Sequence, residues 1–225
     1  MNDPHGLAAV RLVAETRREL SPVAEAISGH RFLGLLRSHS VPEDRLRGLA
    51  AEQRAIVSSD RRSFAMLAAR FPGGHAGDFF LSMAEGEGAA LAELDGFLRW
   101  LGLTPEALRA YEPRAGAQAY PAYVAWLALN GSRTDVVLAF VANLAAWGAN
   151  CGEVAAALRD VYGAGDEAVG FFEYFARPPA VFEERALAVI GEALAEGEDT
   201  VAARRATRLL QSYELSFWDT LAEGL

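Results

Sequence analysis

The chain has 225 residues, of which 52% are hydrophobic and 23% are charged. This composition provides enough apolar side chains for a sizeable core and is unlike that of a disordered chain. The 21 basic and 30 acidic residues give a net charge of −9, which argues against direct binding of nucleic acid. Every basic residue other than histidine is arginine, so the chain has no lysine for a Schiff base or a phosphate-binding loop.

Cysteine content and the apolar runs indicate the cellular compartment of the protein. Cys151 is the only cysteine, so no disulfide can form within the chain, and we expect a reducing cytoplasm. Residues Met1 to Gly6 are polar and contain no secretory hydrophobic stretch. The longest apolar run, 136–151, is interrupted by Asn143 and Asn150, so we expect no association with a membrane.

Apolar residues recur at helical spacing along most of the chain, and proline, glycine and capping residues divide this pattern into segments. Ser21, Asp78, Thr104 and Thr134 are the N-caps that we expect for four of the helices. In chain order, we expect helices over residues 7–20, 22–29, 30–38, 43–70, 78–101, from 105 onward, 117–129, 135–162, 166–176, 180–195 and 200–221.

The fold class follows from what this pattern lacks. No stretch alternates apolar and polar residues with a period of two, so we expect no β-strand. The chain also shows no repeat of fixed period and no low-complexity linker. The sequence therefore predicts an all-α fold, a helical bundle that forms a single domain over residues 1–225. Helices of 20–28 residues would be about 30–40 Å long, which is enough to line one central cavity.

The histidines do not indicate a metal or heme site. They are His5, His30, His39 and His75, and none follows a glutamate by three residues, the spacing that holds di-iron centres in helical bundles. No flanking pattern marks His30 or His39 as a heme ligand, and no glycine-rich nucleotide loop is present. We therefore expect no metal and no other cofactor.

The most apolar helix carries two amides and the cysteine. Asn143 and Asn150 are seven residues apart and share one face, where each amide needs a partner inside the bundle. They could bond to neighbouring helices or point into a ligand cavity, and the sequence leaves both alternatives open. Cys151 is either a small buried hydrophobe, which is the common role of a free cysteine in an apolar helix, or a reactive thiol.

The last helix carries one carboxylate on its apolar side. Glu214 and Trp218 are four residues apart and share a face, and Leu210 and Phe217 extend the apolar stripe. A buried carboxylate is unfavourable unless it is paired or acts on a ligand. Glu214 could instead be paired with an arginine or face solvent.

This closing stretch, Tyr213-Glu214-x-x-Phe217-Trp218-Asp219, resembles the end of the TenA/thiaminase II family. Weaker resemblances occur from His30 to Leu46 and from Asp135 to Glu153. The resemblance implies the heme-oxygenase-like fold, assembly as a homodimer or homotetramer, and a cavity for aminopyrimidines of the thiamine type. It also implies that Glu214 is the catalytic acid and base.

An ungapped placement on the family carries over the other site positions with altered chemistry. The pocket aspartate of the family falls on Gln53, which supplies hydrogen bonds but no charge. The nucleophilic cysteine falls on Asn143, an amide that cannot attack a pyrimidine, or on Ala145 or Ala146 if the register shifts. Cys151 lies about two turns further along, roughly 12 Å by the helical rise.

Aromatic positions of the family pocket are better preserved. One pocket tyrosine falls on Tyr120, and two further tyrosine positions fall on Trp147 and on Phe175, which has Tyr174 beside it. Together with Trp218, these rings would stack on a flat heterocycle while amides and the carboxylate orient it.

Three functions fit this placement. The chain could be an active hydrolase that uses Glu214 with Cys151 as an unorthodox nucleophile. It could be a binding protein on the same scaffold, with the thiaminase II activity altered or lost. It could also be a transcriptional regulator that acts through a protein partner. We favour the second, with a small heterocyclic ligand bound among Gln53, Asn143 and Glu214.

Overall fold

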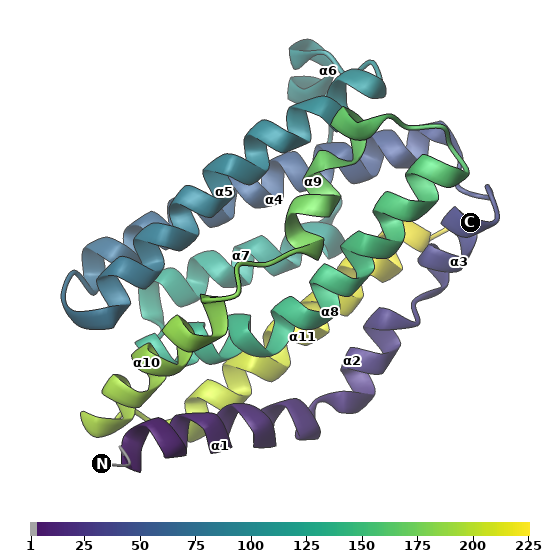
Figure 1. Cartoon of the computed structure of the whole chain (residues 1–225). Coiled ribbons are helices and arrows are strands. Elements are labelled where there is room, and N and C mark those ends of the chain that lie inside the picture. The colour runs from purple at the N-terminus through teal and green to yellow at the C-terminus, as the bar shows by residue number, and fades with distance from the viewer. Residues whose placement is uncertain (1–3) are drawn as a thin grey trace.

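The computed structural model describes residues 4–225, and over that span it contains eleven α-helices and no strand (Figure 1). The first three residues of the polar start noted above lie outside the described part. The helices are α1 Pro4–Glu19, α2 Ser21–Ser28, α3 Arg31–Arg37, α4 Glu43–Arg70, α5 Gly74–Trp100, α6 Pro105–Ala110, α7 Ala115–Asn130, α8 Arg133–Asp160, α9 Asp166–Ala176, α10 Phe182–Ala195 and α11 Thr200–Ala222. The predicted all-α fold is confirmed.

Helix ends agree with the prediction where one strong local signal acts alone. The spans of α4 and α9 coincide with the predicted 43–70 and 166–176. The side chain of Thr104 caps α6 by accepting a hydrogen bond from the backbone nitrogen of Ala107 at 3.2 Å. Proline in the first turn of α6 reinforces this start, because its fixed φ suits that position.

Three predicted caps are wrong. Helix α2 already includes Ser21, so Leu20 occupies the cap position. Helix α5 begins at Gly74, directly after the proline-glycine turn, and Asp78 therefore lies inside it. Helix α8 is capped by Ser132, whose hydroxyl accepts from the backbone of Asp135 at 3.1 Å in a reciprocal capping box.

Two helix pairs and two bridging helices build the body of the molecule. Helix α4 packs along α5, and α8 packs along α11 (Figure 1). Helix α9 contacts α5 and α8, while α7 contacts α4 and α11. The two pairs are thus joined by α9 on one side and by α7 on the other, which leaves an enclosed space between them.

The core is divided into two hydrophobic clusters that meet at this space. One cluster includes Ile56 and Phe217, and the other includes Phe79 and Phe140. Tyr120 packs against both clusters. The polar groups described below therefore lie at the junction of two apolar regions, where water is scarce and an unpaired charge is unfavourable.

Two glycines allow α9 to press against both helix pairs. A Cβ atom on Gly96 of α5 would lie 1.9 Å from the carbonyl oxygen of Glu167, and one on Gly148 of α8 would lie 2.9 Å from that of Phe175. Both distances are shorter than a carbon and an oxygen tolerate. Only glycine therefore permits α9 to sit so close to α5 and α8 at once.

Helix α8 is, by length and composition, apolar enough to cross a membrane, and it is the one such helix in the described part of the chain. Its apolar window is 67% buried inside the bundle. A buried core helix passes the same test of length and composition, so this helix is weak evidence for a membrane span.

Candidate functional site

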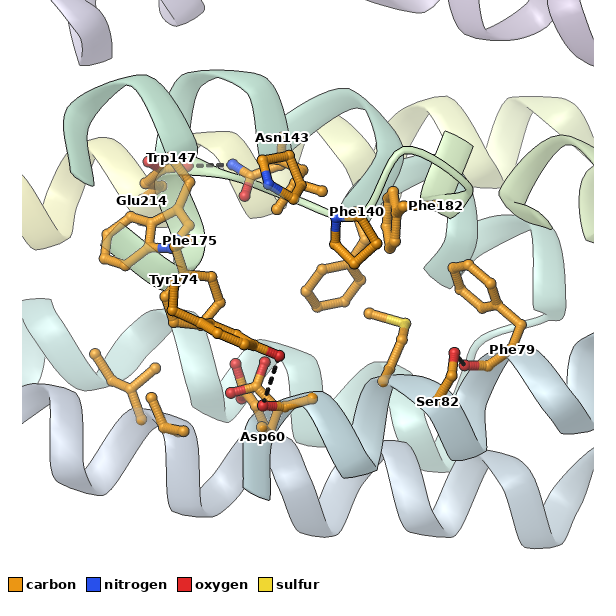
Figure 2. Close-up of a pocket in the computed structure, with 18 of the residues that line it drawn as sticks. Asp60, Phe79, Ser82, Phe140, Asn143, Trp147, Tyr174, Phe175, Phe182 and Glu214 are labelled. Atoms are coloured by element: carbon orange, nitrogen blue, oxygen red, sulfur yellow. Dashed lines mark hydrogen bonds between the residues drawn. The ribbon is translucent and has the colours of Figure 1, made fainter. Parts of the chain in front are cut away.

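A cavity of about 220 Å³ lies between the α4–α5 and α8–α11 pairs (Figure 2). Tyr174, Pro178, Pro179 and Val181, from α9 and its connection to α10, are exposed and form its outer edge. The remaining lining residues are Gln53, Ile56, Val57, Asp60, Phe79, Ser82, Met83, Gly86, Glu87, Tyr120, Phe140, Asn143, Leu144, Trp147, Phe175, Phe182, Arg185, Glu214 and Phe217.

Glu214 is the centre of one wall. Its side chain is buried, with 3% of the residue exposed. The amide of Asn143 donates to Oε2 (Figure 2), and the indole nitrogen of Trp218 donates to Oε1 at 3.3 Å. Both oxygens thus have neutral donors, and none of the described ion pairs involves Glu214. The alternatives of an arginine partner or a solvent-facing position are excluded.

The environment of Glu214 sets its protonation near neutral pH. Burial raises the pKa of Glu214 from 4.5 to about 7, and the hydrogen bonds from Asn143 and Trp218 oppose that rise. A carboxyl group with this pKa exchanges a proton readily at neutral pH. The group can therefore act as an acid, a base or a hydrogen-bonding anchor for whatever enters the cavity.

Most of the residues expected at the site line the cavity together. Gln53 of α4, Tyr120 of α7, and Asn143 and Trp147 of α8 all contribute to the lining. So do Phe175 of α9 and Glu214 of α11. Six of the eight residues that the sequence indicated as candidates are thus brought to one place by five different helices.

Trp218 lies behind the cavity wall. Its ring centre is 5.9 Å from that of Trp147, which does line the cavity. Trp218 is 1% exposed and is absent from the lining. We expected Trp218 to contact the ligand directly. Its indole instead donates to Glu214 and packs behind Trp147, so it supports the cavity wall without lining it.

Cys151 is also outside the cavity lining. The residue is 1% exposed and belongs to a hydrophobic cluster. Burial, with a further contribution from the charge of Glu214, raises the pKa of the Cys151 thiol well above its ordinary range. Because the thiolate is the attacking form, the expected role of Cys151 as a nucleophile has no geometric support.

The two amides of α8 have separate roles. Asn143 points to Glu214 in the cavity, whereas Asn150 donates to the backbone oxygen of Ile27 at 3.0 Å. Asn150 therefore ties α8 to α2. Of the two alternatives that the sequence left open, Asn143 points into the cavity and Asn150 bonds to a neighbouring helix.

Two carboxyl groups in the opposite wall were not anticipated. Asp60 of α4 is 4% exposed, and its Oδ1 atom is buried without a hydrogen-bond partner. Burial raises the pKa of Asp60 from 3.8 to about 8. Burial, and secondly the charge of Asp60, raise the pKa of the half-buried Glu87 of α5. One signal was available, because Asp60 follows Gln53 by seven residues and so shares its face of α4.

Tyr120 stands among all three carboxyl groups. Burial and then the charges of Asp60, Glu214 and Glu87 raise its pKa well above the ordinary range. The phenol therefore keeps its proton and can donate a hydrogen bond. Pro121 follows it inside α7, where the ring removes one backbone hydrogen bond.

Metal-binding side chains do not gather in the described part of the chain. Between residues 4 and 225, no group of three or more His, Cys, Asp or Glu side chains is placed to hold a metal ion. Of the three carboxyl groups of the cavity, Glu214 lies in one wall and Asp60 in the other (Figure 2), and Glu87 comes from α5.

A model of the TENA/THI-4/PQQC family matches residues 17–224. The chain belongs to the TENA/THI-4/PQQC family. The family that the closing helix indicated is thereby confirmed, and Glu214 lies within the matched span. No curated protein sequence matches this family member.

Solved structures resemble this TENA/THI-4/PQQC family chain over nearly its whole length. A TenA homolog from Pseudomonas syringae pv. tomato has a TM-score of 0.75 at 14% identity, over 93% of this chain and 92% of the other. A candidate TenA-like thiaminase from Sulfolobus solfataricus has a TM-score of 0.61 at 15% identity, over 93% and 96%. A domain with a heme-oxygenase-like fold from Shewanella denitrificans has a TM-score of 0.70 at 13% identity, over 93% and 91%. At these identities the likeness establishes the fold, and the predicted heme-oxygenase-like fold is confirmed.

Proposed function

We propose that this protein binds a small, flat heterocycle of the aminopyrimidine type found in thiamine, in the cavity between the helix pairs. The observation that carries this proposal is Glu214, a buried carboxyl group whose two oxygens are held by Asn143 and Trp218 at the cavity wall. Such a group presents a fixed edge to the N–H and ring-nitrogen groups of a pyrimidine. Family membership and the likeness to a candidate thiaminase support a thiamine-related ligand.

The size and the aromatic walls of the cavity support a flat ligand. Cavities of about 150 Å³ in protein cores bind benzene, so about 220 Å³ accommodates one ring with a short substituent. Trp147 and Phe175 lie edge to face, with ring centres 5.9 Å apart, on one side of the cavity (Figure 2). Phe140 and Phe79 provide further apolar surface. A planar ring gains contact with these faces without displacing charged groups.

Thiaminase II chemistry is altered or lost in this proposal, because no cysteine lines the cavity in the described residues. The hydroxyl of Ser82 is the one alcohol of serine or threonine in the lining, and it donates to the backbone oxygen of Phe79 at 2.7 Å. Hydrolysis of a C–N bond by covalent attack on the pyrimidine needs an activated nucleophile. Glu214 retains acid and base chemistry without such a partner.

The remaining expectations are part of the same proposal. We place the protein in the cytoplasm, as one domain that assembles into a homodimer or homotetramer and contacts neither nucleic acid nor a membrane. The negative net charge supports the absence of nucleic-acid contact.

Calorimetric titration with thiamine and 2-methylpyrimidin-4-amine tests the ligand class. We expect binding that weakens at least about 10-fold in Glu214→Gln, which corresponds to the loss of about 1.4 kcal/mol. Glu112→Gln, which changes an exposed carboxylate on the connection before α7, is the matched control and should bind as the wild type does.

A turnover assay on the same proteins tests the catalytic part. We expect no release of pyrimidine from thiamine. Absence of binding by both compounds, or equal binding by Glu214→Gln, would refute the ligand class. Thiamine cleavage that disappears in Cys151→Ala would show that the protein is an active hydrolase.

A further inference from the structure

Helix α7 has no charged side chain, although 23% of the residues in the chain are charged. Every other helix in the described part of the chain carries at least one. A helix that is predominantly apolar on all sides is normally buried on all sides. Helix α7 is instead covered on one side only, where it packs between α4 and α11 and Tyr120 faces the cavity (Figure 1).

The uncovered side of α7 carries five apolar residues, which we call its outer face: Ala115, Ala119, Ala122, Trp126 and Leu129. Trp126 is 53% exposed and Leu129 is 61% exposed, and Ala115 and Ala122 are exposed as well. Successive members are four, three, four and three residues apart, which is the spacing by which one helix packs along another. A contiguous apolar surface of this kind marks an interaction site.

Trp126 is held in place before any partner arrives. Its ring stacks on that of Tyr123, with ring centres 5.7 Å apart and an angle of 6° between the planes. Tyr123 in turn contacts Tyr213 of α11, with ring centres 5.2 Å apart. A side chain that is already ordered loses little conformational entropy on binding. Tryptophan and tyrosine are also enriched among the residues that contribute most to the affinity of protein interfaces.

The neighbouring helices extend this surface to the size of a protein interface. Met66 of α4 is 41% exposed and lies one turn from Arg70, which donates to the backbone oxygen of Ala128 at 2.6 Å. Helix α7 has 16 residues and is about 24 Å long. Packed helix axes are about 8–10 Å apart, so α4, α7 and α11 form a side roughly 25 Å wide. A flat area of roughly 600 Å² results, before the helical ridges are counted, against about 800 Å² per partner in a stable interface.

The outer face is complementary to itself. Its first half carries alanines, and its second half carries the large Trp126 and Leu129. A two-fold axis at Ala122 that sets two copies of α7 antiparallel places Trp126 over Ala119 of the partner subunit. The same axis places Leu129 over Ala115 of the partner subunit. Each large side chain then meets a small one, and a surface that matches itself in this way is what a symmetric pair of subunits requires.

We propose that the outer face of α7 docks on the same face of a second copy of this chain, with the two α7 helices antiparallel. The inference rests on the homo-oligomer of the proposed function and names its surface, and it is independent of the proposed ligand. Two copies with a net charge of −9 each repel one another at long range. An uncharged face lets them meet without burying an unpaired charge.

Light scattering and sedimentation velocity at micromolar concentration measure the mass of the assembly. We expect the wild type to have at least twice the 24.2 kDa mass of one chain. Ala122→Glu and Ala122→Arg should each raise the dissociation constant across this face at least about 100-fold, because the two-fold axis places like charges opposite one another. The mass of either variant should therefore fall to half that of the wild type.

An equimolar mixture of the two Ala122 variants tests the arrangement itself. The new carboxylate of one copy then faces the new guanidinium of the other, and the wild-type mass should return. Ala156→Glu changes an exposed alanine on α8 and should keep the wild-type mass. Glutamate and arginine are good helix formers, and circular dichroism verifies that each variant is folded.

The outcomes separate this inference from the proposed function. A monomeric wild type would overturn both the proposed assembly and this surface. An unchanged mass in both Ala122 variants would place the assembly on another face and overturn this inference alone. Two variants of half mass whose mixture does not regain the wild-type mass would overturn the antiparallel two-fold arrangement. The calorimetric titrations with 2-methylpyrimidin-4-amine test the ligand separately, whatever the mass.

Discussion

Replacing Asp60 with asparagine should stabilise the ligand-free protein, and the gain should increase with pH. The folded state raises the pKa of Asp60 from 3.8 to about 8. Between these values the unfolded chain loses the proton while the folded protein keeps it. The folded protein therefore binds more protons, and this group lowers the free energy of unfolding as pH rises through that window. Asparagine has no proton to lose, so the variant escapes this decline.

The size of the effect follows from the pKa shift. Each pH unit inside the window lowers the free energy of unfolding by about 1.4 kcal/mol for one such group. Between pH 5 and pH 7, the advantage of Asp60→Asn over the wild type should therefore grow by about 3 kcal/mol. Any constant penalty for burying the new amide cancels in this difference. The charge of Asp60 is also one cause of the raised Glu87 pKa, so its removal acts in the same direction.

Urea unfolding followed by circular dichroism at pH 5 and pH 7 measures this difference. The wild type, Asp60→Asn and the control Glu85→Gln should share one dependence on urea, which shows that the exposed surface is unchanged. Glu85→Gln should show no pH-dependent gain, because its carboxylate is exposed. An equal stability difference at both pH values would refute a buried, protonated Asp60.

Two further substitutions test the roles of buried groups outside the cavity. Cys151→Ala removes a 1% exposed thiol from a hydrophobic cluster. The variant should lose about 1 kcal/mol of stability and keep the wild-type affinity for 2-methylpyrimidin-4-amine. A lower affinity in calorimetric titration would contradict this expectation. Glu52→Gln should lower the free energy of unfolding by about 3 kcal/mol, because one oxygen of this fully buried carboxylate accepts from Tyr111 and Arg114, both at 2.7 Å, and the other accepts from the amide of Gln118, where glutamine would present a second N–H donor. A loss below about 1 kcal/mol in urea unfolding would show that these bonds contribute little.

Helix boundaries could be predicted where one residue decides them, and not where neighbours compete. Proline and glycine after α4 leave the helix no continuation, so its end was clear. At the start of α8, both Ser132 and Thr134 are good caps. The choice depends on Thr134 donating instead to Glu198 at 2.9 Å, a contact with the segment before α11 that no local pattern reveals.

The cavity wall around Glu214 could be predicted, and the opposite wall could not. Glu214 belongs to a distinctive closing motif. Asp60 follows two serines and precedes two arginines, and such a polar run is typical of a solvent-exposed helix face. Its burial depends on how α5 packs along α4. Helical spacing placed Trp218 on the correct face, but spacing carries no information on how deeply a side chain lies behind a wall.

At helix α9, which lies between Gly96 and Gly148, some positions fix where the helix lies and others determine the surface of the cavity. The two glycines fix where this helix lies, because any larger side chain there would meet backbone. Tyr174 and Phe175, on the same helix, determine what the cavity wall presents to its contents. Substitutions at these two positions can thus give a descendant of this protein a new ligand preference while its helices stay in place.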